Sequence, residues 1–217
     1  MQTHIFRGAL RALMIPAALG TLLAGCSNAN DPYAKIANPP LVEARLHTVT
    51  IISDNAKLGS DLQKEGYKAM NLPPNYPAAD DVQAVLWDVP AAVVKEGPVF
   101  VFTAPGNGPN LRFLAEVLPA RPPGADAGIN RSFFRNVLGT DVPQLPEKVV
   151  LTEHARVQVW SYQIPNLIEM RKKLRAAAIP VVTEPVAITT SYLGDQKSMS
   201  LRAPDGTIVE LVEFAAQ

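Results

Sequence analysis

The chain has a single cysteine, Cys26, among its 217 residues, so it cannot form an intramolecular disulfide. The same count excludes a cluster of thiolate metal ligands and leaves no cysteine nucleophile in the body of the protein. An excess of one charge is also missing: 20 basic and 20 acidic residues balance, and no basic stripe predicts binding to nucleic acid. The P-loop, GxGxxG and GxSxG motifs are absent, which argues against P-loop nucleotide hydrolysis, Rossmann cofactors and serine-hydrolase chemistry.

The first 25 residues have the features of an export signal. A basic start precedes an apolar run from Ala12 to Gly25 that is too short to cross a bilayer comfortably. Leu23-Ala-Gly-Cys26 resembles a bacterial lipobox, whose cysteine is acylated, and by resemblance to Gram-negative lipoproteins Ser27 favours the outer membrane, facing the periplasm. The alternatives are an ordinary secretory signal with a chance cysteine, or a buried free thiol. Residues 26–40 are expected to be a tether.

The part of the chain from Leu41 onward, about 175 residues, suffices for one domain or for two small modules that share a core. Two halves predict the same element order, β-α-β-β-β. In the first half we expect a strand at 46–53, a helix at 57–69 and strands at 82–89, 99–103 and 111–117. In the second half we expect a strand at 156–163, a helix at 165–178 and strands at 188–192, 198–202 and 207–214. Residues 121–150 form a linker with a short helix near 131–138.

The end of the chain combines a tight turn with a charge among apolar residues. Pro204-Asp-Gly206 separates two β-rich runs and predicts a hairpin. The period-2 rule then places Glu210 on one strand face with three apolar residues, Ile208, Val212 and Phe214. A carboxylate in that position is costly unless it meets a cation or hydrogen-bond donors. Glu210 is therefore the first candidate for a functional residue.

This ending resembles the closing hairpin of the vicinal oxygen chelate superfamily, the group of glyoxalases and extradiol dioxygenases. Its domains commonly end in Asp-Pro-Asp-Gly-x-x-x-Glu-Leu, and Pro204–Gly206 and Glu210-Leu211 stand in the matching places. Leu46–Asp54 is similar to the family's opening strand, and Pro165–Pro185 to its second helix and the strand that follows. The resemblance implies an α+β fold in which two β-α-β-β-β modules, 41–120 and 151–217, form one half-open eight-stranded barrel.

In the metal-dependent members of this family, each module supplies one ligand from its first strand and one from its last. By this resemblance His47 matches the first ligand, Glu210 the last, and Glu116 the ligand that closes the first module. Such a set would suit Zn, Ni, Fe or Mn. The fourth position falls near Val159, which is not a ligand, and His154 could replace it only if that strand began earlier. We therefore expect an incomplete metal site.

Two functions are consistent with the resemblance. The first is an exported, membrane-anchored, metal-dependent lyase, isomerase or dioxygenase, resembling lactoylglutathione lyase, with Glu210 as ligand or general base. The second is a non-catalytic protein that sequesters a small hydrophobic or aromatic molecule in the open barrel. A metal at His47 and Glu210 would favour the first function, and an apolar cavity in which Glu210 pairs with an arginine, Arg112 or Arg202, would favour the second. Family members often complete their sites by dimerising, so a homodimer is an open alternative.

Overall fold

The computed structural model describes residues 30–36, 39–53, 55, 57–72, 76, 81–95, 99–115, 126–146, 149, 155–188 and 194–215. The expectations for Cys26, Glu116 and His154 fall outside these residues. Within the described segments, no helix combines the length and the apolar character needed to cross a membrane.

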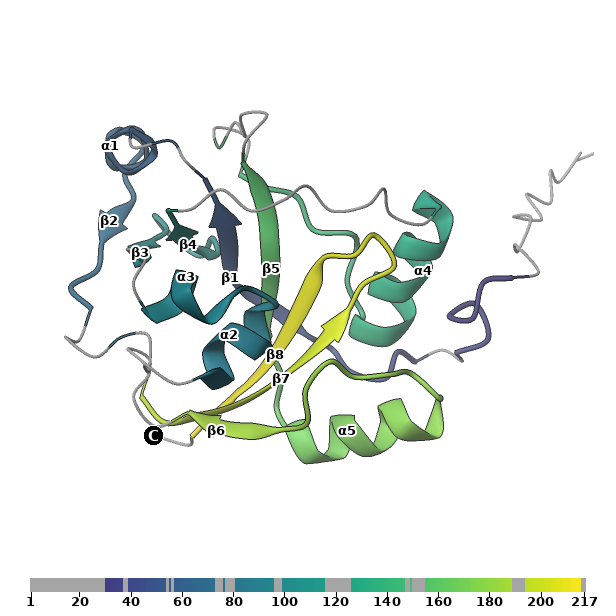
Figure 1. Ribbon diagram of the computed structural model, residues 1–217. Helices are drawn as coiled ribbons and strands as arrows, with labels where there is room; N and C mark the ends of the chain where they lie inside the picture. The colour runs from purple at the N-terminus through teal and green to yellow at the C-terminus, as the bar shows by residue number, and fades with distance from the viewer. Residues whose placement is uncertain are drawn as a thin grey trace, which may run out of the picture.

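Eight strands form one open sheet in the order β2-β3-β4-β1-β5-β8-β7-β6 (Figure 1). They are β1 (Arg45–Ile52), β2 (Lys68–Ala69), β3 (Val99–Thr103), β4 (Asn110–Leu114), β5 (Arg156–Gln163), β6 (Val186–Ile188), β7 (Gln196–Arg202) and β8 (Ile208–Phe214). The first strands of the two modules, β1 and β5, pair antiparallel at the centre, and each pairs in parallel with the last strand of its own module, β4 or β8. Outward from the centre, each module therefore places its first strand, then its fourth, third and second. The predicted α+β fold class is confirmed.

The predicted hairpin at the end of the chain is present between β7 and β8. Gly206 donates its backbone N–H to the Ala203 carbonyl at 2.9 Å, and Thr207 donates its N–H to the Asp205 carboxylate at 2.9 Å. Gly206 has a φ of 83°, which glycine adopts without the penalty of a Cβ. The turn therefore fixes the register of β8, and with it the face on which Glu210 lies.

The prediction of a strand at 82–89 is wrong, because Asp81–Trp87 forms helix α2 and Ala91–Lys95 forms helix α3. Burial follows a helical period: Gln83, Leu86 and Trp87 are buried, whereas Val85 is 53% exposed. A half-buried strand would bury alternate residues instead. The second strand of module one is the short β2, which pairs with β3.

Two apolar cores lie on opposite faces of the sheet. The larger core receives side chains from α1 (Leu58–Lys64), α4 (Ala127–Leu138) and α5 (Leu167–Ala176), and the smaller one from α2 and α3. Neighbouring residues of β8 divide between them: Val209 joins the larger core and Ile208 the smaller one. In Figure 1, α4 and α2 accordingly lie on either side of β8. Helix α2 thus covers the sheet face to which Glu210 belongs.

Part of the range expected to be a tether contacts α4, through the described residues 31–36 and 39–44. The Tyr33 ring meets Phe133 edge to face with the ring centroids 5.2 Å apart, and Asn136 donates its side-chain N–H to the Tyr33 carbonyl at 2.9 Å. Ala44 donates its N–H to the Leu138 carbonyl at 2.9 Å, which satisfies one of the carbonyls left unpaired at a helix end. We refer to residues 31–44 as the N-terminal arm.

Candidate functional site

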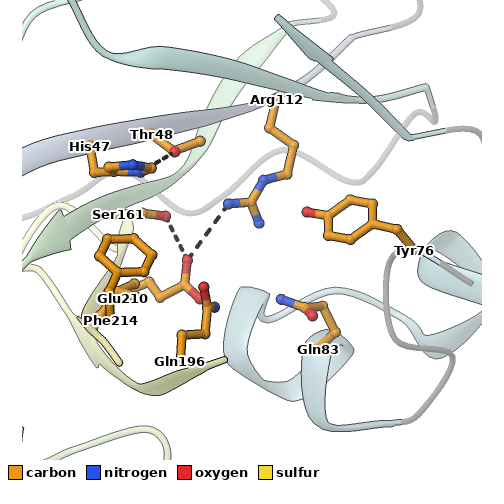
Figure 2. Close-up of a pocket in the computed structure, with 10 residues that line it drawn as sticks. His47, Thr48, Tyr76, Gln83, Arg112, Ser161, Gln196, Glu210 and Phe214 are labelled. Carbon is orange, nitrogen blue, oxygen red and sulfur yellow. Dashed lines mark hydrogen bonds and ion pairs between the residues drawn. The ribbon is translucent and has the colours of Figure 1, made fainter. Parts of the chain in front are cut away.

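The site is a small cavity between α2 and the central strands (Figure 2). Its volume is about 10 Å³, which is room for about one water molecule. Its walls carry two charged groups, hydroxyls, amides and an imidazole, contributed by His47, Thr48, Tyr76, Gln83, Arg112, Ser161, Gln196, Glu210, Val212 and Phe214. The cavity is therefore polar, whereas the sequence analysis associated ligand sequestration with an apolar one.

The register of the central strands relates the two modules. Thr48 of β1 lies opposite Ser161 of β5, and Thr50 lies opposite Val159. A two-fold rotation about the midpoint of these pairs exchanges β1 with β5, so that Thr50 superposes on Ser161 and Thr48 on Val159. Val159, near which the fourth ligand was expected, is fully buried in the smaller core and has no donor atom for a metal.

The same rotation places β4 on β8. Thr50 lies beside Arg112 in module one, and Ser161 lies beside Glu210 in module two. Arg112 and Glu210 therefore occupy equivalent positions on the last strands of the two modules. The sequence analysis proposed Glu116 for this position, but β4 ends at Leu114 and Glu116 lies outside the described residues. Within the described register, the residue that corresponds to Glu210 is an arginine.

His47 reaches the cavity through a β-bulge. The pairing between β1 and β5 shifts after Leu46, which leaves His47 as an extra residue before Thr48. A bulge can turn two successive side chains toward the same face, and both His47 and Thr48 line the cavity. The His47 Nδ1 atom lies 2.8 Å from the Thr48 hydroxyl, and the ring centroid lies 5.0 Å from that of Phe214. Nδ1 is therefore engaged, and Nε2 is the ring nitrogen left to meet a ligand.

The environment of His47 favours the neutral imidazole. Burial, followed by the positive charges of Arg112 and Arg45, lowers the pKa of His47 from 6.5 to about 4. Both effects disfavour the imidazolium, because burial removes its hydration and the guanidinium groups repel it. At neutral pH His47 is thus uncharged.

Glu210 is a buried carboxylate with two partners. Its side chain is 2% exposed, and its Oε2 accepts a hydrogen bond from the Ser161 hydroxyl at 2.6 Å. The same oxygen lies 3.9 Å from an Arg112 nitrogen (Figure 2), and the Arg112 guanidinium lies over the Trp87 ring at 4.2 Å from the ring centroid. Arg202, the other arginine considered, pairs instead with Asp88 at 3.1 Å. The cation that compensates Glu210 is therefore Arg112.

The donor set does not fit a divalent metal. No group of three or more His, Cys, Asp or Glu side chains within the described segments could hold an ion. His47 and Glu210 line the same cavity, but the Arg112 guanidinium beside Glu210 would repel a second cation. Two donors next to a fixed positive charge are a poor match for a metal that takes three or four protein ligands.

Several residues of the site were not predicted from the sequence. Gln83 comes from the helix that had been taken for a strand. Arg112, which is 5% exposed, was considered only as a partner for Glu210. A signal for Arg112 exists, because an arginine between Leu111 and Phe113 in a β-rich run is the same anomaly that identified Glu210.

No protein-family model matches the chain, and no similar sequence was found among curated proteins. Among solved structures, methylmalonyl-CoA epimerase from Mycobacterium tuberculosis is similar at 14% identity and a TM-score of 0.44, over 84% of this chain and 95% of that one. A glyoxalase/bleomycin resistance protein/dioxygenase superfamily member from Vibrio splendidus is similar at 8% identity and a TM-score of 0.39, over 78% and 97%. A mutant of 4-hydroxymandelate synthase from Streptomyces coelicolor is similar at 11% identity and a TM-score of 0.42, over 81% and 50%. Such distant likeness concerns the fold and carries no argument about chemistry.

Proposed function

We propose that this protein is an exported, lipid-anchored binding protein with a glyoxalase-like fold, whose site takes a small polar molecule without a metal. The observation that carries the proposal is the state of Glu210, whose Oε2 accepts the Ser161 hydroxyl and faces the Arg112 guanidinium at 3.9 Å. A buried carboxylate with a hydroxyl donor and a cation is compensated. It is not left to bind a metal, so the metal-dependent lyase, isomerase or dioxygenase is the less favoured hypothesis.

The lining of the cavity favours a small uncharged ligand with hydrogen-bond donors and acceptors, because the buried Arg112–Glu210 pair is already neutral. The 3.9 Å between Glu210 and Arg112 is longer than a hydrogen bond, and the cavity has room for about one water there. A ligand oxygen could take the place of that water. A guanidinium presents several N–H donors in a fixed geometry, and that of Arg112 lies over the Trp87 ring at 4.2 Å from its centroid.

Ligand entry requires α2 to move, since binding pockets for small molecules usually measure about 300–1,000 Å³ and this cavity is far smaller. Gln158 donates its Nε2 to the Trp87 and Asp88 carbonyls at 2.8 and 3.0 Å, and these bonds hold the C-terminal end of α2 on the sheet. Gln83, nearer the other end of the helix, lines the cavity. The ligand is therefore expected to displace the Gln83 end of α2.

The proposed anchor would hold the body near the membrane. Acylation of Cys26 would leave four residues, 27–30, before the N-terminal arm begins at Asp31. Four extended residues span at most about 14 Å. The lipid-anchored protein would thus present its ligand site at a restricted height above the bilayer instead of on a long tether.

Full-length protein, purified in mild detergent without chelators, tests the proposal. We expect less than stoichiometric metal by elemental analysis, no rise in melting temperature with Zn²⁺, Ni²⁺ or Mn²⁺, and a rise with at least one member of a panel of small uncharged polar molecules such as amides and polyols. At a ligand concentration of 100 Kd, the gain is about 2.7 kcal/mol. Arg112→Gln should abolish the rise, and Arg202→Gln is the matched control. Stoichiometric metal that His47→Ala removes would contradict the proposal.

A further inference from the structure

Arg112 and Glu210 hold equivalent positions in the two modules and carry opposite charges. The strand register superposes Thr50 on Ser161 and, with them, Arg112 on Glu210. Both side chains are almost completely buried, at 6% and 2% exposure. The two modules therefore supply one positive and one negative group to the same cavity, and the pair is electrically neutral without any ion from solution.

We infer that the Arg112 guanidinium takes the place of a divalent cation at this site, and that Arg112 is the residue that excludes metal. Two acids at these equivalent positions would repel each other unless a cation lay between them. With an arginine at one position, the positive charge is part of the chain, and a metal ion would place a second positive charge beside the buried guanidinium. The inference shares with the proposed function the premise that the natural site is free of metal.

Two other groups that can bind a metal line the same cavity as Arg112. His47 is directed into the cavity by the bulge in β1, with Nδ1 beside the Thr48 hydroxyl. Imidazole is a common metal ligand through either ring nitrogen, and Nε2 is the ring nitrogen of His47 not engaged with Thr48. Glu210 lines the same cavity. A carboxylate at position 112 would add a third donor from the strand equivalent to β8.

The test is a gain of metal binding by Arg112→Glu in the full-length protein. Without metal, this variant should melt well below the natural protein, because two buried carboxylates then face each other. Ni²⁺ or Zn²⁺ should restore the melting temperature and bind at one ion per chain by calorimetry. The variant should bind about two orders of magnitude more tightly than Arg112→Gln, since a four-ligand zinc site yields roughly that much affinity per ligand.

Two control variants separate a built site from a change in charge. Arg202→Glu makes the same charge change at an exposed arginine on β7 and should bind no metal. Adding Glu210→Gln to Arg112→Glu should lower the affinity again by about two orders of magnitude. If Arg112→Glu folds only when metal is present, this also supports the inference, because metal binding and folding are then coupled.

The inference is overturned if Arg112→Glu, folded or unfolded, does not respond to millimolar Ni²⁺ or Zn²⁺, or if it binds no more tightly than Arg202→Glu. In either case the proposed function would stand. Stoichiometric metal in the natural protein would instead overturn both, because Arg112 would then fail to exclude it. The two failures are therefore distinguishable in one set of measurements.

Discussion

Replacing Glu210 by glutamine should destabilise the protein through the cation it leaves behind. The substitution keeps the shape of the side chain and an oxygen that can accept a hydrogen bond from the Ser161 hydroxyl. In the natural protein that hydroxyl lies 2.6 Å from Glu210 Oε2. It removes the charge that faces Arg112, whose side chain is 6% exposed. Removing one partner of a buried pair costs about 3–5 kcal/mol. The 3.9 Å separation is too long for a hydrogen bond, so we expect the lower end, about 3 kcal/mol.

This loss should appear as a fall of about 6–12 °C in melting temperature, because a domain of 150–250 residues loses roughly 2–4 °C per kcal/mol. Differential scanning calorimetry at pH 7 measures it. Adding Arg112→Met to Glu210→Gln removes both charges and should recover part of the loss, which reports the coupling between the two residues. Glu184→Gln is the matched control, since Glu184 pairs with Arg171 at 2.7 Å on the surface, where such pairs contribute little. The hypothesis that the pair compensates a buried charge is wrong if Glu210→Gln has the melting temperature of the natural protein. It is also wrong if the double variant is less stable than the single one.

Three further perturbations test other parts of the structure. Because the pKa of His47 is lowered from 6.5 to about 4, the unfolded chain takes up its proton first as the pH falls. As the pH falls from 6.5 to 4, His47 should therefore lower the free energy of unfolding by about 1–2 kcal/mol, after allowance for its partial exposure. The natural protein should lose more stability than His47→Gln over that range, and equal slopes would exclude the effect. Gln158→Met removes two hydrogen bonds to the end of α2, so residues 81–95 should exchange amide hydrogens faster while β8 stays protected. Unchanged exchange would mean that Trp87 packing alone holds the helix. Cys26→Ser should release the protein from the membrane fraction with its melting temperature unchanged, and continued sedimentation with membranes or palmitate incorporation would contradict the lipobox hypothesis.

The parts of the fold that were predicted correctly are those specified locally. The Pro204–Gly206 turn sets its own geometry, and the alternation along β8 assigned Glu210 to a face before any neighbour was known. Helix α5 begins where Asn166 accepts the Glu169 N–H at 2.8 Å, as expected for a capping residue. The helix in the linker was also expected, although α4 begins earlier, at Ala127. In each case the determining residues lie within a few positions of one another.

The parts that were missed depend on contacts between distant segments. Residues 82–89 contain β-formers, and their composition alone favours a strand. The helix is favoured over a strand because it buries Trp87 over Arg112. It also places the Trp87 carbonyl beside Gln158, which is 71 positions away. The extent of the N-terminal arm was missed for the same reason, since its polar residues gain their order from the surface of α4. Local propensity contains no information about either contact.

The candidate site was predicted only in part: Glu210 was identified from the sequence, whereas its relation to Arg112 required the structure. The rule that identified Glu210, that a charge among apolar residues on a strand must be compensated, applies equally to Arg112 between Leu111 and Phe113. Applied to both residues, the rule predicts that the negative charge of Glu210 and the positive charge of Arg112 compensate each other if the fold brings them together. The family resemblance directed attention to residues that bind metal, and so toward Glu116. The register of β1, β4, β5 and β8 is the added information, because it places the two charged residues at equivalent positions around one cavity. A cation already present in the chain then balances the charge of Glu210, so the carboxylate needs no metal ion to compensate it.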